Sequence, residues 1–131
     1  MSDVVTRARA LVGTRFRPQG RDPRHGLDCV GLALAAYRLP AARGDYALRG
    51  TARAAVEESL RPWFRRVSRS EARDGDLLLV RAAVDVLHLG IRSGAGMIHA
   101  DARYGVVERP GALPWPLLAV FRRRVRARVG G

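Results

Sequence analysis

The sequence predicts a single α+β domain over residues 1–131, with N-terminal helices packed on a mainly antiparallel sheet of about five strands. Two observations predict it. Segments with helical spacing or helix caps occupy the first half, and short apolar runs separated by turn residues occupy the second. The composition agrees with a folded domain, because 47% of the residues are hydrophobic and no repeat or linker is visible.

Three helices are predicted, over residues 3–12, 29–39 and 51–60. Asp28 is a candidate N-cap for the second helix and Thr51 for the third. Residues 13–27 are polar and rich in Gly, Pro and Arg, and therefore predict a loop.

The predicted strands are the runs DLLLVRA, VLHLGIRS, MIHAD, GVVERP and LLAVFRRR. They are rich in β-branched and other apolar residues and are separated by turn residues. The basic segment 122–131 is predicted to be a solvated tail that frays at its end, with a docking strand as the alternative.

The formal net charge is +12, and every basic residue is an arginine. A lysine-free chain rich in Ala, Gly and Arg suggests GC-rich codons, which weakens any argument from the arginine count. The positive field favours anionic partners, but no nucleic-acid motif is present and we expect no nucleic-acid partner. Charged residues interrupt the first segment, so we expect no signal peptide or membrane anchor, and synthesis in the cytoplasm.

Cys29 is the only cysteine, which excludes an internal disulfide and a multi-cysteine metal site. On the predicted helix it continues an apolar stripe, and by itself this favours a packing role. Its place in the first turn points the other way, because the helix dipole there lowers a thiol pKa. Gly26 and Gly31 on either side would let a substrate approach the backbone.

His88 and His99 lie in two adjacent predicted strands joined by the glycine-rich segment RSGAG. With the turn centred between Ser93 and Gly94, the two histidines are predicted to be direct cross-strand partners on one face. One imidazole could then act as a base toward a thiol while the other orients it. His25 is predicted to be an exposed loop residue or part of the cleft.

Four stretches, LDCVGLALAAY, RDGDLLLV, LHLGI and MIHAD, resemble in order and spacing the NlpC-type cell-wall cysteine peptidases. The segment FRPQGRDPRHGLDCVGL is similar to the corresponding segment of the compact branch of this family that is encoded in phage tail clusters and gene transfer agents. The resemblance implies a papain-like fold without metal or organic cofactor. It also implies hydrolysis of peptide bonds in peptidoglycan stems, with Cys29 as nucleophile, His88 as general base and His99 as the residue that orients His88.

The resemblance also implies substrate contacts at Asp28, Val30 and Phe16, where two of the three residues depart from the family pattern. Asp28 matches a position that in related enzymes helps bind the amino end of the substrate. Val30 stands where the family usually has Ser or Thr, and Phe16 roughly where many members have a tyrosine. Arg92 replaces an aromatic residue. These departures bear on the substrate rather than on the Cys-His-His set.

Three functions therefore stay open at this point. The first is a wall peptidase carried by a phage tail or related particle, with tail or baseplate proteins as partners and the periplasm as its place of action. The second is a structural hub of a tail assembly that keeps the fold without the activity, and alkylation of Cys29 separates it from the first. The third is a basic nucleic-acid-binding domain, tested by salt-dependent binding to DNA.

Overall fold

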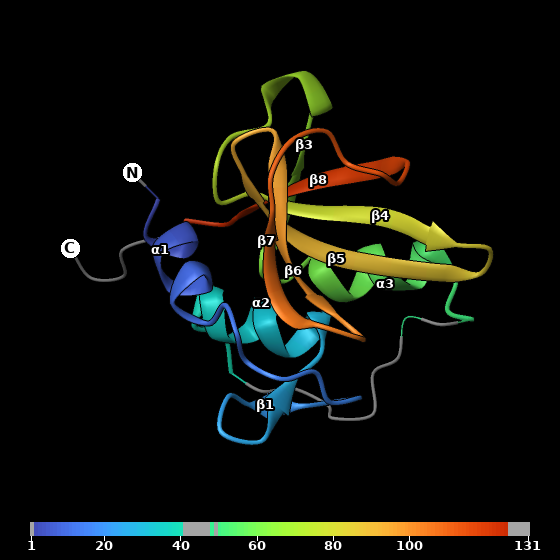
Figure 1. The fold of residues 1–131 in the computed structure, drawn as a ribbon. Helices are drawn as coiled ribbons and strands as arrows, with labels where there is room; N and C mark the ends of the chain where they lie inside the picture. The colour runs from blue at the N-terminus through green and yellow to red at the C-terminus, as the bar shows by residue number, and fades with distance from the viewer. Residues whose placement is uncertain (1, 41–47, 49, 126–131) are drawn as a thin grey trace.

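The computed structural model describes residues 2–40, 48 and 50–125 (Figure 1). The helices are α1 (Asp3–Ala10), α2 (Cys29–Tyr37) and α3 (Arg53–Leu60), and a short 3-10 turn covers Arg69–Glu71. The strands are β1 (Arg21–Asp22), β2 (Gly26–Leu27), β3 (Phe64–Val67), β4 (Leu77–Ala83), β5 (Val86–Ser93), β6 (Gly96–Asp101), β7 (Gly105–Arg109) and β8 (Leu117–Arg123). Within the described ranges, no helix has the length and hydropathy needed to cross a bilayer.

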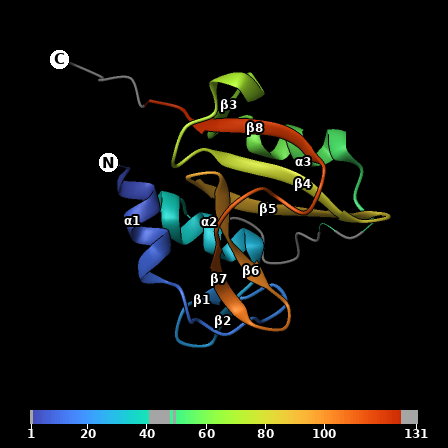
Figure 2. The same ribbon diagram turned by 45° about the horizontal axis from the view of Figure 1, so that its top comes forward.

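Six strands form one antiparallel sheet in the order β3-β8-β4-β5-β6-β7, and β1 and β2 form a small separate hairpin. Helices α1 and α2 lie side by side against β5 and β6, as both ribbon views show (Figures 1 and 2). Val56 of α3 packs into the same apolar core as the buried residues of α2. The result is a helix layer on one face of a strongly curved sheet.

The apolar run of β4 is explained by burial on both faces of the sheet. Leu77 and Leu79 belong to the main core beneath the helices, whereas Leu78 and Val80 belong to a smaller cluster on the opposite face. Trp115 and its neighbours in the segment before β8 pack against that second cluster. A central strand covered on both sides needs apolar residues at every position.

The α+β prediction is confirmed, with six strands in the main sheet rather than about five. The five predicted strands correspond to β4 to β8. Strand β3 was missed because two arginines in FRRV break the apolar pattern. The predicted loop 13–27 contains the two-residue strands β1 and β2, which are too short to leave a periodic signal. The third helix begins at Arg53 after Ala52, so Thr51 is not its N-cap.

Helix α2 is held at its N-terminal end by a cap and by close packing. The Asp28 side chain accepts a hydrogen bond from the Gly31 amide at 2.8 Å, as predicted for an N-cap. Gly31 packs directly on the carbonyl of Gly20, where a Cβ atom would collide with backbone. Leu32 and Ala36 anchor the next turns in the core. The position of Cys29 is therefore set from both sides of the helix start.

The predicted basic tail starts later than residue 122, because Arg122 and Arg123 belong to β8. Arg122 is not solvated. Its Nε and Nη2 atoms each donate to the Asp76 carboxylate at 2.9 Å, and the Asp76 side chain is only 4% exposed. The rest of the predicted tail from residue 126 lies outside the described residues.

Removing the buried carboxylate of Asp76 is expected to destabilise the fold. Asp76→Ala leaves the Arg122 guanidinium half-buried without its anion and removes the acceptor for the Arg73 amide. We expect the free energy of unfolding to fall by about 3 kcal/mol in urea denaturation. Glu58→Gln is the matched control, because its pair with Arg61 is 68% exposed on both sides. That variant should stay within about 0.5 kcal/mol of wild type; equal effects of the two substitutions would contradict the prediction.

Candidate active site

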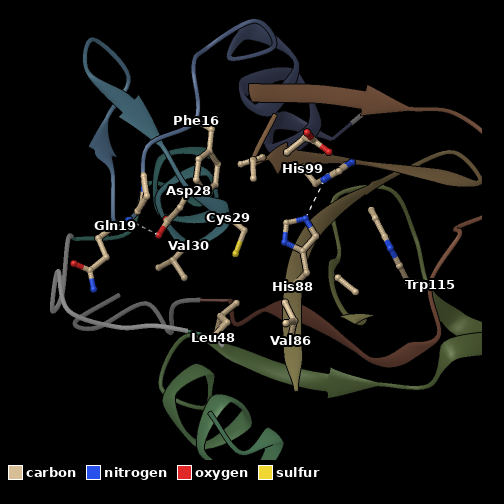
Figure 3. A pocket seen from close by; sticks show the side chains of 15 residues that line it. Phe16, Gln19, Asp28, Cys29, Val30, Leu48, Val86, His88, His99 and Trp115 are labelled. Carbon is tan, nitrogen blue, oxygen red and sulfur yellow. Dashed lines mark hydrogen bonds between the residues drawn. The ribbon is translucent and has the colours of Figure 1, made fainter. Parts of the chain in front are cut away.

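A pocket of about 510 Å³ opens between the start of α2 and the strands β5 and β6 (Figure 3). Its wall includes the six residues that the family resemblance marks as catalytic or substrate-binding: Phe16, Asp28, Cys29, Val30, His88 and His99. His25 is exposed and does not line the pocket, which leaves its loop interpretation in place. Residues far apart in the chain thus meet in one cleft.

Cys29 is the first residue of α2, and Figure 3 shows its sulfur and the His88 imidazole on facing sides of the pocket. Burial raises the pKa of the thiol to about 12, against the lowering effect of backbone hydrogen bonds with Leu89 and Val30. The backbone at the helix start does lower the thiol pKa, through Val30, but burial has the larger effect and the net pKa is raised. Loss of water around a thiolate outweighs the favourable field of one helix turn.

The two histidines are adjacent, but the predicted register is wrong. Ser93 pairs with Gly96, so the turn is Gly94–Ala95 and the pairing is shifted by two residues from the prediction. Gly94 adopts a positive φ of 59°, which favours glycine and sets the turn there. A shift of two keeps both imidazoles on one face.

The imidazoles are joined edge to face by a hydrogen bond. His88 Nε2 lies 2.9 Å from His99 Nδ1, and the ring planes are 87° apart. Since Nε2 of His88 is engaged with His99, its Nδ1 is the nitrogen left for Cys29, and Figure 3 shows the ring turned to the sulfur. When Nδ1 is the free acceptor, the His88 proton resides on Nε2 and is donated to His99. This arrangement holds His88 in the tautomer that can receive a proton from the thiol.

Burial lowers the pKa of His88 to about 4, and the neighbouring His99 lowers it further while Asp101 raises it. Burial also lowers the pKa of His99, again opposed by Asp101. Both imidazoles are therefore neutral at neutral pH. A neutral thiol thus faces a neutral base, and charge develops only when the proton moves between them.

Sequence reasoning missed Trp115, which lies beside both histidines. Its ring centroid is 5.7 Å from that of His88 and 5.3 Å from that of His99, both in edge-to-face geometry. The available signal was the pair of prolines around one of only two tryptophans. Trp115 covers the histidines, and His99 Nε2 is buried with no hydrogen-bond partner among the described residues.

Sequence reasoning also missed the partner of Asp28. Arg21 of β1 donates from Nη1 to Asp28 Oδ1 at 2.7 Å, and the backbone N–H of Gln19 donates to Oδ2 at 3.0 Å. Arg21 stands eight positions before Cys29 in a segment that has no periodicity. Only the fold of the β1–β2 hairpin brings it to the helix start.

A metal site finds no support in the part of the chain that the structure describes, where no three His, Cys, Asp or Glu side chains gather in a way that could hold an ion. The pocket combines a thiol, an imidazole pair and apolar walls. Such a set is suited to nucleophilic attack by sulfur with a neighbouring general base.

The model of the NlpC/P60 family matches residues 13–112, a range that contains the cysteine, both histidines and the strands that carry them. The chain belongs to the NlpC/P60 family. Among curated proteins, none matches it closely enough to count as a relative.

Solved structures of NlpC/P60 domains have the same fold. One is the NlpC/P60 domain of the peptidoglycan hydrolase SagA, with 26% identity, a TM-score of 0.59 and coverage of 82% of this chain and 86% of that one. Another is an NLP/P60 lipoprotein-like protein from Staphylococcus aureus, with 23% identity and a TM-score of 0.59. This chain is 96% covered in that match but spans only 41% of the staphylococcal one. The papain-like NlpC-type fold expected from the sequence is confirmed.

The low pKa of His88 in this NlpC/P60 domain predicts acid sensitivity. Between pH 6.5 and 4 the unfolded chain binds a proton at His88 that the folded chain does not, so stability falls as the pH is lowered. The contribution of His88 to this loss of unfolding free energy approaches about 3 kcal/mol at pH 4. His88→Gln should make the free energy of unfolding depend less on pH, as measured by urea denaturation at pH 7, 5 and 4.

The exposed His25 supplies the control for this experiment. His25→Gln should keep the wild-type dependence on pH, since the substitution changes nothing in the pocket. The interpretation is wrong if His88→Gln and His25→Gln lose stability equally between pH 7 and 4.

Proposed function

We propose that this chain is a cysteine peptidase that hydrolyses peptide bonds in the stem peptides of peptidoglycan. The observation that carries the proposal is the single cleft in which the only cysteine faces an imidazole held by a second imidazole. Membership of the NlpC/P60 family and the likeness to a domain of a peptidoglycan hydrolase support the substrate.

In the proposed acylation step, Cys29 Sγ attacks the carbonyl carbon of the scissile amide while His88 Nδ1 accepts the thiol proton. Because the thiol pKa is high and the His88 pKa is low, proton transfer and bond formation proceed together. A helix start leaves its first backbone amides without intrahelical partners, so the Cys29 N–H can stabilise the oxyanion, an interaction worth about 3 kcal/mol of barrier.

The imidazolium of His88 then gives its proton to the leaving amine, and the C–N bond breaks to leave a thioester on Cys29. Water attacks the thioester, with His88 again accepting a proton, and releases the carboxylate and the free thiol. His99 holds His88 in the required orientation throughout. Asp101 favours the charged form of His88 and so assists the step in which the imidazolium forms.

Digestion of purified peptidoglycan tests this function. The expected products are soluble fragments whose masses reveal one new amino end and one new carboxyl end within the stem peptide. Unfolded casein serves as the control for general proteolysis and should stay intact. The absence of any new peptide end in peptidoglycan from walls of different stem chemistry would contradict the proposal.

Delivery by a phage tail or gene-transfer-agent particle is a further part of the proposal. The stretch FRPQGRDPRHGLDCVGL, which resembles that branch, supports it. Mass spectrometry of purified particles from the organism that encodes the chain tests it directly. The chain should co-purify with tail proteins, and its absence from intact particles would contradict this delivery.

A further inference from the structure

The Asp28 carboxylate lies in the pocket wall and accepts three hydrogen bonds from the protein. Oδ1 accepts from the Gly31 backbone N–H at 2.8 Å and from Arg21 Nη1 at 2.7 Å. Oδ2 accepts from the Gln19 backbone N–H at 3.0 Å. The side chains of Arg21 and Asp28 are each only 15% exposed. A carboxylate in this state is a structural cap paired with a cation, and it has little capacity left for a ligand.

The cleft has a direction that follows from the chemistry proposed above. The leaving amine must reach His88, so the part of the substrate beyond the scissile bond lies on the side of β5 and β6. The part before the scissile bond therefore extends to the other side of Cys29. Figure 3 shows Asp28, Gln19 and Val30 on that side, away from His88.

We propose that Arg21 is a positioning residue of the active site, which neutralises Asp28 so that the cleft accepts peptides with an acylated, uncharged amino end in preference to a free ammonium group. This inference rests on the proposed function and names the form of the substrate. A stem peptide still joined to its glycan has such an acylated amino end, whereas a released stem peptide carries an ammonium group.

The charge balance also acts on the nucleophile. Asp28 raises the pKa of the Cys29 thiol and Arg21 lowers it, so the two effects oppose each other one residue away from the sulfur. The other charged or titratable groups of the pocket, His88, His99 and Asp101, face it from β5 and β6. A substitution of Arg21 can therefore change the charge near Cys29 without changing the two histidines.

Alkylation of Cys29 by iodoacetamide provides a readout that needs no substrate, since the chain has no other cysteine. Arg21→Gln leaves the Asp28 charge uncompensated and should slow alkylation roughly three- to tenfold at a fixed pH, through a thiol pKa raised by up to about one unit. Asp28→Asn keeps an N-cap side chain and should speed alkylation by a similar factor. The double variant should return near the wild-type rate, as a double-mutant cycle for one charge pair requires.

Arg24→Gln is the matched control, because Arg24 belongs to the same hairpin but pairs with Asp22 instead of Asp28, and its side chain is 83% exposed against 15% for Arg21. Its alkylation rate should equal that of wild type, and Arg21→Lys should retain most of the wild-type rate because it keeps the charge. Circular dichroism and urea denaturation identify any variant that fails to fold. If Arg21→Gln alkylates as fast as Arg24→Gln, the charge role of Arg21 is excluded.

Peptide cleavage tests the substrate half of the inference. The substrates are the tripeptide L-Ala-γ-D-Glu-diaminopimelate with a free amino end and the same peptide N-acetylated. Wild type should cleave the acetylated form with about tenfold higher kcat/KM, and Arg21→Gln should narrow that ratio. An equal or higher kcat/KM for the free amino form overturns the inference while the proposed function stands. If neither peptide nor intact peptidoglycan is cleaved, the proposed function fails, and the alkylation cycle alone decides the role of Arg21.

Discussion

Cys29→Ala is expected to abolish cleavage of peptidoglycan and leave the fold intact. The sulfur is the only thiol in the chain and forms the bond to the acyl group, so the cleft keeps no nucleophile without it. We expect a loss of roughly 10³-fold or more in kcat, down to the background of the assay. The measurement is release of soluble fragments from purified peptidoglycan, followed by mass.

The fold should survive this change, because Cys29 is half-buried at the start of its helix and alanine is a strong helix former. Urea denaturation should show a loss of about 1 kcal/mol or less. Wild-type levels of wall digestion by the Cys29→Ala chain would end the cysteine-peptidase proposal, because the activity would then not depend on the thiol. Loss of folding would make Cys29→Ser the variant to use, because it keeps the side-chain size and lacks the thiolate chemistry.

His88→Gln and His99→Gln are expected to differ in the size of their effects. His88 is the base that receives the thiol proton, so its loss should lower kcat/KM by about 10²- to 10⁴-fold. His99 acts through the 2.9 Å contact that orients His88, so its loss should cost about ten- to hundredfold, or about 1.4–2.7 kcal/mol of barrier.

The pH profile separates the two roles further. His99→Gln removes the neighbour that helps lower the pKa of His88, so the acid limb of the activity profile should move to higher pH. His25→Gln is the control and should leave both rate and profile unchanged, because His25 is exposed outside the pocket. An activity loss from His99→Gln as large as that from His88→Gln would contradict the division of roles.

Much of the fold was predictable because its elements carry strong local signals. The strands β4 to β8 are short apolar runs between turn residues. Helix α2 begins after the capping residue Asp28 and ends before Pro40, at Arg38, whose backbone adopts the left-handed conformation. Strand β3 was missed because both of its central residues, Arg65 and Arg66, are exposed, which leaves it only two apolar residues and no alternating pattern. The two-residue strands of the β1–β2 hairpin carry no period that a pattern could detect.

The site was predictable as a set of residues but not as a geometry. The face shared by His88 and His99 follows from the side-chain period of two, because shifting the strand pairing by two residues leaves each side chain on the same face. The register itself depended on which glycine-rich dipeptide formed the turn, and the structure places it at Gly94–Ala95. Trp115 reaches the pocket from a loop, and Arg21 reaches Asp28 from a hairpin, where sequence spacing does not determine position.

The sequence by itself determined the three helices, the strands β4 to β8, the identity of the only possible thiol nucleophile, and the face that the two histidines share. These depend on local periodicity, capping and composition, which each segment carries within itself. Only the tertiary structure decided that burial raises the pKa of Cys29, that His88 is a neutral base, and that Arg21 neutralises Asp28. Desolvation and charge pairing depend on neighbours from distant segments, so they exist only once the chain has folded.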